Sequence, residues 1–198
     1  MFSKEMAKAV SEGQKVMDKI CNSDNVSIRA SSDIKRFADK MDKMDPSKIN
    51  FSKKGLLNNK RISAYWSRFN DNYAELKSLY KCVAADAQVV QNTICTLKVE
   101  YEEFKEVYNG FRSDTSSETA AADSEIATQM VVSQNMDCLF TNTIAEYEAL
   151  KSRLDSIVLM SKQLLDMAVL IAKMDTRLRL SYDPKNFVSA YSKLKSIL

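Results

Sequence analysis

The sequence contains no histidine, only three glycines and only two prolines. Without histidine, the chain lacks the side chain that most often acts as a general base, as a pH switch near neutrality and as a metal ligand. Glycine and proline form most tight turns, so their scarcity leaves few points at which the chain can reverse direction. Long helices are therefore expected, and the 45% of hydrophobic residues is enough for a packed core.

Cysteine is also sparse. The four residues of this type are Cys21, Cys82, Cys95 and Cys138, and no two of them form a CxxC motif. Because histidine is absent, a zinc site would need all four thiolates. We therefore expect reduced thiols, no metal and no other cofactor, a pattern that is typical of a cytoplasmic protein.

Hydrophobic runs long enough to cross a membrane are missing from the sequence. Segment 1–13 is interrupted by charge every few residues, which argues against a secretory signal. The most apolar window, 157–171, contains Lys162 and Asp166, and it is shorter than the roughly 20 residues that a spanning helix needs. The sequence therefore predicts a soluble chain.

Apolar residues are abundant, in contrast, in one long pattern. From Ile62 to Phe111, every residue at alternating steps of three and four is apolar or aromatic. This spacing predicts a single helix that contacts a partner helix along its length. The residues expected in this helix–helix core, aromatic towards both ends and small in the middle, include Trp66, Phe69, Tyr73, Tyr80, Ala87, Tyr101, Phe104 and Tyr108.

Two long helices follow from the pattern and its breaks. Asn109–Gly110 has the composition of a helix C-cap, so the first long helix is expected to span about 62–110. A second is expected over about 125–180, where the apolar spacing resumes. Its N-cap lies within 115–125, with Thr115 and Asp123 as open alternatives.

Shorter helices are expected at about 3–21 and 27–44, and Asp183–Pro184 is expected to start a last one. Asp45–Pro46 can start a further short turn, within a basic linker over 46–61. Two long helices joined by one loop pack antiparallel. We therefore predict an all-α fold, an elongated antiparallel bundle built on two long coiled-coil-like helices and forming one domain. The two N-terminal helices, or a second subunit, are expected to cover at least its end near Trp66.

Charge is unevenly distributed along the chain. From Lys35 to Arg68 there are ten Lys or Arg against three Asp, and from Lys173 to the C-terminus there are six against two. From Lys98 to Glu125 there are three against eight acidic residues. An antiparallel hairpin would bring the first two segments together as a basic pole and place the third at the other end. The residues expected to contact an anionic partner are Lys48, Lys53, Lys54, Lys60, Arg61 and Arg68.

Patterns that indicate catalysis are absent. The sequence has no glycine-rich phosphate loop and no nucleophile elbow, and Glu102, Glu103 and Glu106 are expected on an exposed helix face. We therefore predict no enzymatic activity and no small-molecule substrate. The leading hypothesis is a non-enzymatic helical scaffold or protein-interaction module that docks an acidic partner surface through its basic pole. A second copy of the chain, in a homodimer, is a further expected partner.

Two other classes of partner remain open. The basic pole also suits an anionic membrane surface, and the face formed by Phe2, Met6 and Val10 could then enter the lipid. Long antiparallel helices with a basic patch are similar in outline to BAR domains and to helical pore-forming toxins, a likeness of architecture without a shared motif. A nucleic-acid backbone is less favoured, because the aromatic residues fall on the core stripe. If none of these partners exists, the charges only keep the chain in solution.

Overall fold

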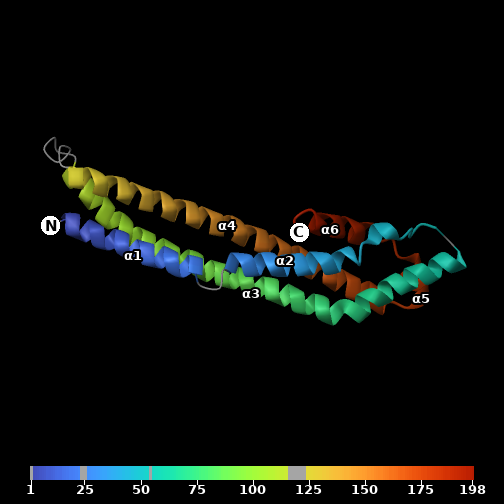
Figure 1. Cartoon of the computed structure of the whole chain (residues 1–198). Helices are drawn as coiled ribbons and strands as arrows, with labels where there is room; N and C mark the ends of the chain where they lie inside the picture. The colour runs from blue at the N-terminus through green and yellow to red at the C-terminus, as the bar shows by residue number, and fades with distance from the viewer. Residues whose placement is uncertain (1, 23–25, 54, 116–123) are drawn as a thin grey trace. The chain divides into compact units, whose positions relative to one another are not determined.

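The structure is a computed structural model that describes residues 2–22, 26–53, 55–115 and 124–198. It contains, in chain order, α1 (Phe2–Asn22), α2 (Val26–Asp42), the short 3-10 turn η1 (Pro46–Lys48), α3 (Leu56–Thr115), α4 (Ser124–Lys173), α5 (Thr176–Ser181) and α6 (Lys185–Lys195) (Figure 1). It is 91% helical, and the described ranges contain no strand. The predicted all-α bundle, in which two long helices pack together with shorter helices at both termini, is confirmed.

The chain divides into two compact units. Unit 1 comprises Met1–Ser27 and Gln88–Lys151, and unit 2 comprises Ile28–Ala87 and Ser152–Leu198. Both α3 and α4 contribute residues to each unit. Whether the two units form the predicted single domain stays a prediction. The division falls in the middle of the α3 stripe, where the heptad positions carry small residues such as Ala87.

Unit 1 is built from α1, the C-terminal part of α3 and the N-terminal part of α4. Its core consists of Met6, Met17, Leu97, Phe104, Tyr108, Phe111, Met136, Phe140 and Ile144. The expectation that α1 covers the chain near Trp66 is therefore wrong, because Met6 and Met17 of α1 belong to this core. The buried Gly13 allows this packing, since a Cβ atom there would lie 3.0 Å from Cε2 of Phe140.

Unit 2 has a core rich in aromatic rings. Phe187 of α6 packs edge-on against Trp66 and Phe69 of α3, with ring centroids 5.0 and 5.4 Å away. Tyr65, which lies outside the predicted stripe, packs on Trp66 at 5.0 Å and on Phe51 at 5.6 Å. On the α2 side the buried residues are Ala30, Ile34, Phe37 and Met41. Helices α2, α3 and α6 and the loop before α3 thus all contribute buried residues to unit 2.

Burial along the α3 stripe varies with position. Of the eight residues named above as its helix–helix core, five are buried, namely Trp66, Phe69, Ala87, Phe104 and Tyr108. The other three are half-buried, namely Tyr73, Tyr80 and Tyr101. A phenol can pack its ring and still keep its hydroxyl near water, which suits these partly covered positions.

Two predicted helix ends are wrong. Helix α3 continues through Gly110 to Thr115. Phe111 is only 1% exposed and belongs to the unit 1 core, and the helix that continues past Gly110 keeps Phe111 on the same face as Phe104 and Tyr108. Helix α4 ends at Lys173, not near residue 180. Since Thr115 is the last residue of α3, it cannot be the N-cap of α4, and Asp123 lies outside the described residues.

Candidate binding groove of unit 2

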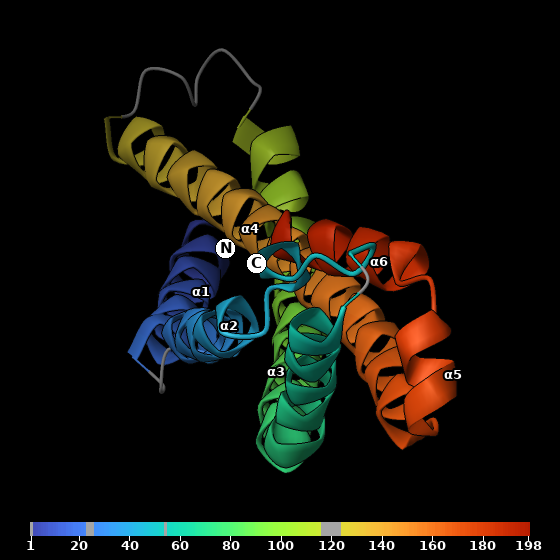
Figure 2. The same cartoon turned by 90° about the vertical axis from the view of Figure 1, so that its right-hand side faces the viewer.

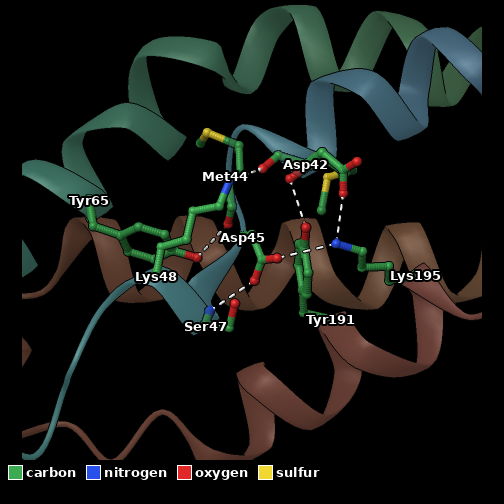
Figure 3. Close-up of polar contacts among 9 residues, drawn as sticks. Asp42, Met44, Asp45, Ser47, Lys48, Tyr65, Tyr191 and Lys195 are labelled. Atoms are coloured by element: carbon green, nitrogen blue, oxygen red, sulfur yellow. Dashed lines mark hydrogen bonds and ion pairs between the residues drawn. The ribbon is translucent and has the colours of Figure 1, made fainter.

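The turn after α2 is anchored by hydrogen bonds to α3 and α6 (Figure 3). The Tyr65 hydroxyl donates to the carbonyl oxygen of Met44 at 2.8 Å, and the Tyr191 hydroxyl donates to that of Met41 at 2.9 Å. Burial raises the pKa of Tyr191 to about 12 and raises that of Tyr65 further. Both phenols therefore stay protonated, and keep donating to the turn, at a pH where an exposed tyrosine already ionises.

Asp45 and Lys195 close this turn with charge. The Asp45 carboxylate accepts a hydrogen bond from the Ser47 backbone N–H at 2.9 Å, which confirms that Asp45 caps the short turn starting at Pro46. Lys195 lies 2.9 Å from Asp42 and 3.2 Å from Asp45. Burial acts to raise the pKa of Asp45, but the hydrogen bonds from Ser47 and Lys195 outweigh it and lower that pKa. The positive charge of Lys195 is thus compensated by two carboxylates within unit 2.

The loop between η1 and α3 is held by two asparagines. The Asn50 side-chain oxygen accepts from the backbone N–H groups of Ser52 and Lys53 at 3.2 and 3.1 Å. The Asn58 amide donates to the carbonyl oxygens of Asn50 and Lys53 at 2.7 and 2.6 Å. Gly55, with φ at +143°, lets the chain turn into α3. These contacts fix the loop that follows Lys48 and carries Lys53.

A groove of about 1330 Å³ lies between this loop, the start of α3, α5 and the start of α6. Helix α6 also packs against η1, which directly precedes this loop (Figure 2). Its apolar lining residues include Ile49, Phe51, Ile62, Leu180 and Val188. Its charged lining residues are Lys48, Lys53, Arg177, Lys185 and Asp183.

The charge balance of the groove is strongly positive. Its single carboxylate, on Asp183, lies 3.2 Å from the Lys185 ammonium. Lys48 donates to the carbonyl oxygen of Asp42 at 3.2 Å, which orients its ammonium without cancelling its charge. The groove therefore presents four cations against one carboxylate, beside an apolar lining.

The basic residues predicted from the sequence separate into two sets. Lys48 and Lys53 line the groove. Lys60, Arg61 and Arg68 are exposed on α3 and do not line it, and Lys54 lies outside the described residues. Both sets belong to unit 2.

Arg177 and Lys185 were missing from the predicted partner site. They lie in the basic C-terminal segment that begins at Lys173, whose excess of six basic over two acidic residues was the available signal. The spacing alone did not single them out, because their approach to Lys48 depends on the turn between α4 and α5. Unit 2 thus unites the two basic segments of the chain.

Other kinds of site find no support in the described part of the chain. No group of three or more Asp, Glu or Cys side chains there is placed to hold a metal ion. Cys82, Cys95 and Cys138 are free thiols, and Cys21 lies outside the described side chains. None of the helices described combines the length and apolar character needed to cross a bilayer. Among the three cavities described, the groove has the largest volume, about 1330 Å³ against about 390 and 150 Å³, and it brings together the most charged side chains.

Compared with known proteins, the chain matches no family model, no curated protein and no solved structure. The residues and the geometry of the groove are therefore the basis for assigning a function.

Proposed function

We propose that this protein is a non-enzymatic helical interaction module that binds an acidic segment of a partner protein in the groove of unit 2. The observation that carries the proposal is the set of four cations, Lys48, Lys53, Arg177 and Lys185, beside one carboxylate. Opposite charge steers such partners together and selects against basic ones.

The size and lining of the groove favour a peptide segment over a small molecule. Its volume of about 1330 Å³ exceeds the roughly 300–1,000 Å³ of ordinary ligand pockets. Apolar residues such as Phe51, Leu180 and Val188 can contact the apolar side chains of the segment, while the cations contact its carboxylates. An extended acidic segment with interspersed apolar residues satisfies both surfaces.

The chemistry of the groove also supports a binding role without catalysis. Asp183, its one carboxylate, is paired with Lys185 and is exposed, so it is poorly suited to act as a general base. The free thiols Cys82, Cys95 and Cys138 do not line the groove. Free thiols are common in reducing compartments, which supports a cytoplasmic location.

A labelled peptide of about ten residues with alternating Glu and Leu tests this proposal by fluorescence anisotropy. We expect binding at about 50 mM salt that weakens strongly at about 500 mM, because exposed charges are screened. The variant Lys53→Glu/Arg177→Glu/Lys185→Glu should weaken binding about tenfold or more. The matched control Lys35→Glu/Lys81→Glu/Lys162→Glu reverses the same number of exposed charges in unit 2 outside the groove, and it should change binding less than about twofold.

Three results would overturn the proposal. One is the absence of peptide binding by the wild-type protein at low salt. Another is an equal loss in the groove variant and its control, which would show that only the overall charge matters. The third is displacement of the peptide by a single-stranded oligonucleotide that binds the groove more tightly, which would assign the site to a nucleic acid.

A second copy of the chain is one source of an acidic segment. Helix α3 exposes Glu102, Glu103 and Glu106 within the acidic stretch from Lys98 to Glu125. This acidic run supports the homodimer as a form of the same interaction. Light scattering coupled to gel filtration should then show dimers at low salt, and the groove variant should be a monomer under the same conditions.

A further inference from the structure

Helix α3 begins with two leucines that are exposed to solvent. Leu56 is 75% exposed and Leu57 is 79% exposed, the highest values among the large hydrophobic residues of the described chain. Gly55 precedes them with its left-handed φ of +143°, so the chain turns immediately before the pair. An adjacent pair of uncovered leucines at a turn is unfavourable in water unless a partner covers it.

The leucine pair lies beside a basic helix face. Lys60 and Arg61 follow Leu56 and Leu57 by four residues each, which places them on the same side of α3. Both are exposed, and so is Lys53 in the preceding loop. The apolar pair is therefore bordered on both sides along the chain by cations.

This face is distinct from the groove. Asn59 and Ile62 are the residues of α3 that line the groove, whereas Leu56, Leu57, Lys60 and Arg61 do not. Lys53 is shared by both surfaces. A ligand in the groove consequently leaves the leucine pair uncovered.

We propose that this end of α3 docks on an anionic lipid bilayer. Leu56 and Leu57 enter the interfacial region, while Lys53, Lys60 and Arg61 contact lipid phosphates and carboxylates. Lysine and arginine suit this position, because their alkyl stems pack against apolar groups while their charges stay in the headgroup layer. Basic residues flanking an apolar anchor give the two signals that stable attachment to a membrane surface requires.

The composition of the surface favours lipid over a protein partner. Two leucines alone form a far smaller apolar area than the roughly 800 Å² that each partner contributes to a standard protein interface. The residues that follow on the exposed face of α3, up to Arg68, are small, polar or basic, so the apolar pair is not continued. A bilayer needs no such continuation, because it accepts single side chains and supplies the negative charge that the cations match.

The alternative membrane surface expected on α1 is not available. Met6 is fully buried in the unit 1 core and Val10 packs against that core, while the side chain of Phe2 lies outside the described residues. In this proposal the leucine pair of α3, and not the apolar face of α1, is the part of the chain that enters the lipid.

Flotation with vesicles of about 30% phosphatidylserine in phosphatidylcholine tests the docking, with pure phosphatidylcholine vesicles beside them. Insertion is measured separately, as the rise in surface pressure of a lipid monolayer of the same composition. We expect the wild-type protein to float with the anionic vesicles and to raise the pressure. Leu56→Ser/Leu57→Ser should lower binding about tenfold and abolish the pressure rise, whereas Lys60→Glu/Arg61→Glu should abolish binding at about 100 mM salt.

The matched control is Leu159→Ser/Leu170→Ser, which removes two leucines of α4 in unit 2 that are 59% and 65% exposed. It should bind and insert like the wild type. Circular dichroism of every variant checks that the helices remain. Equal losses in the leucine variant and this control would overturn the proposal, as would the absence of wild-type binding to anionic vesicles.

Apart from the shared Lys53, this surface is separate from the groove whose function is proposed above. The variant Leu56→Ser/Leu57→Ser should keep its affinity for the acidic peptide, because neither residue lines the groove. A second groove variant, Arg177→Glu/Lys185→Glu, leaves the shared Lys53 in place. Loss of vesicle binding in this variant, with normal binding by the leucine variant, would assign lipid binding to the groove and overturn the proposal. Conversion of a dimer to a monomer by the leucine variant, without change in lipid binding, would assign the leucines to an interface between copies and also overturn it.

Discussion

Gly13 sets how closely α1 approaches α4 within unit 1. The space for a side chain at this position is already occupied, since a Cβ atom would lie 3.0 Å from Cε2 of Phe140 and 3.3 Å from the sulfur of Met136. Phe140 is fully buried, so its ring has little room to move away. A glycine in the middle of a helix is intrinsically unfavourable, and the close packing is the reason that it is tolerated here.

Gly13→Ala is therefore expected to lower the free energy of unfolding. The gain in helix propensity is about 0.5–1 kcal/mol, whereas overpacking a core typically costs about 1–3 kcal/mol. We expect a net loss of about 1 kcal/mol, measured by urea denaturation followed by circular dichroism. In a double-mutant cycle, Phe140→Leu should remove most of the cost, because it clears the space. A stabilising Gly13→Ala would show that Phe140 yields.

Single residues of the core were predicted unevenly from the sequence. Heptad positions such as Trp66 and Phe104 are apolar, and their burial follows from the spacing alone. Asp86 is different, because it is a charged residue outside the stripe positions and is nevertheless only 2% exposed. Its carboxylate pairs with Arg29 Nε at 2.7 Å, a contact between α3 and α2 that no local pattern encodes. Ion pairs between helices depend on tertiary placement, so the sequence could not reveal this one, in which Asp86 is buried and Arg29 is 47% exposed.

At the scale of elements, the joint between α4 and α5 determines the shape of the groove. Arg179 Nη2 donates to the carbonyl oxygens of Ala172 and Met174, both at 2.7 Å, and so caps the end of α4. Asp175 caps α5 by accepting from the backbone N–H groups of Arg177 and Leu178 at 2.8 and 3.0 Å. These contacts hold α5, which carries Arg177 and Leu180, at the groove.

Substitution of Arg179 should loosen this joint. Hydrogen bonds from a charged donor contribute about 1.5–3 kcal/mol, and Arg179 is only partly buried, so Arg179→Ala should lower the free energy of unfolding by about 1–2 kcal/mol. It should also weaken binding of the acidic peptide, although Arg179 does not line the groove. Urea denaturation and peptide anisotropy measure the two effects. Arg179→Lys keeps the charge but not the planar fork, and it should restore affinity only in part. Unchanged peptide affinity in Arg179→Ala would show that α5 keeps its place without this cap.

The break between α4 and α5 illustrates why helix ends were the weakest part of the sequence prediction. Residues 174–175 contain neither glycine nor proline, and the apolar spacing continues to Leu178. In the structure Leu178 is 59% exposed, because the helix has already stopped at Lys173. The stop relies on the side chain of Arg179, five residues beyond Met174, and such a contact is visible only in three dimensions. The start at Asp45–Pro46 was predicted correctly, because Asp45 caps the turn through a local hydrogen bond. At Asp183–Pro184 the position of the helix start was right, but the N-cap residue of α6 is Pro184, which makes no side-chain cap hydrogen bond, and Asp183 accepts instead from the Lys185 backbone N–H at 3.2 Å.

At the scale of the whole molecule, the pattern of side-chain sizes along the α3 stripe corresponds to the two units. Its aromatic ends supply Trp66 and Phe69 to one core and Phe104 and Phe111 to the other, and the division falls beside Ala87 between them. The sequence could predict this grading from large to small to large side chains. It could not predict which short helix joins which core, because α1 and α2 have similar amphipathic patterns.

Both units contain phenols that resist ionisation. Burial is the main cause that raises the pKa of Tyr101 in unit 1 to about 12, and the hydrogen bond that its hydroxyl donates to Asp137 at 2.9 Å is the next. Burial likewise raises the pKa of Tyr191 in unit 2 to about 12. In the unfolded chain a tyrosine has a pKa of about 10. Between about pH 10 and 12, the folded protein therefore holds protons that the unfolded chain releases.

The protein should consequently lose stability as the pH rises through this window. The contribution of Tyr101 and Tyr191 is fully present below about pH 10 and lost by about pH 12. The urea midpoint should fall between these limits, and Tyr101→Phe/Tyr191→Phe should flatten that decline while losing some stability at pH 8. An unchanged pH profile in the double variant would assign the alkaline transition to other groups.

The single tryptophan of the chain lies in only one of the two cores. Trp66 is 1% exposed among Phe51, Tyr65, Phe69 and Phe187, whereas the rings of the unit 1 core are all phenylalanine or tyrosine. Light absorbed selectively by indole therefore reports on unit 2 alone, while unit 1 is spectroscopically silent at that wavelength. The backbone signal of the helices comes from both. The chain thus carries a built-in probe that separates the melting of one unit from the melting of the whole.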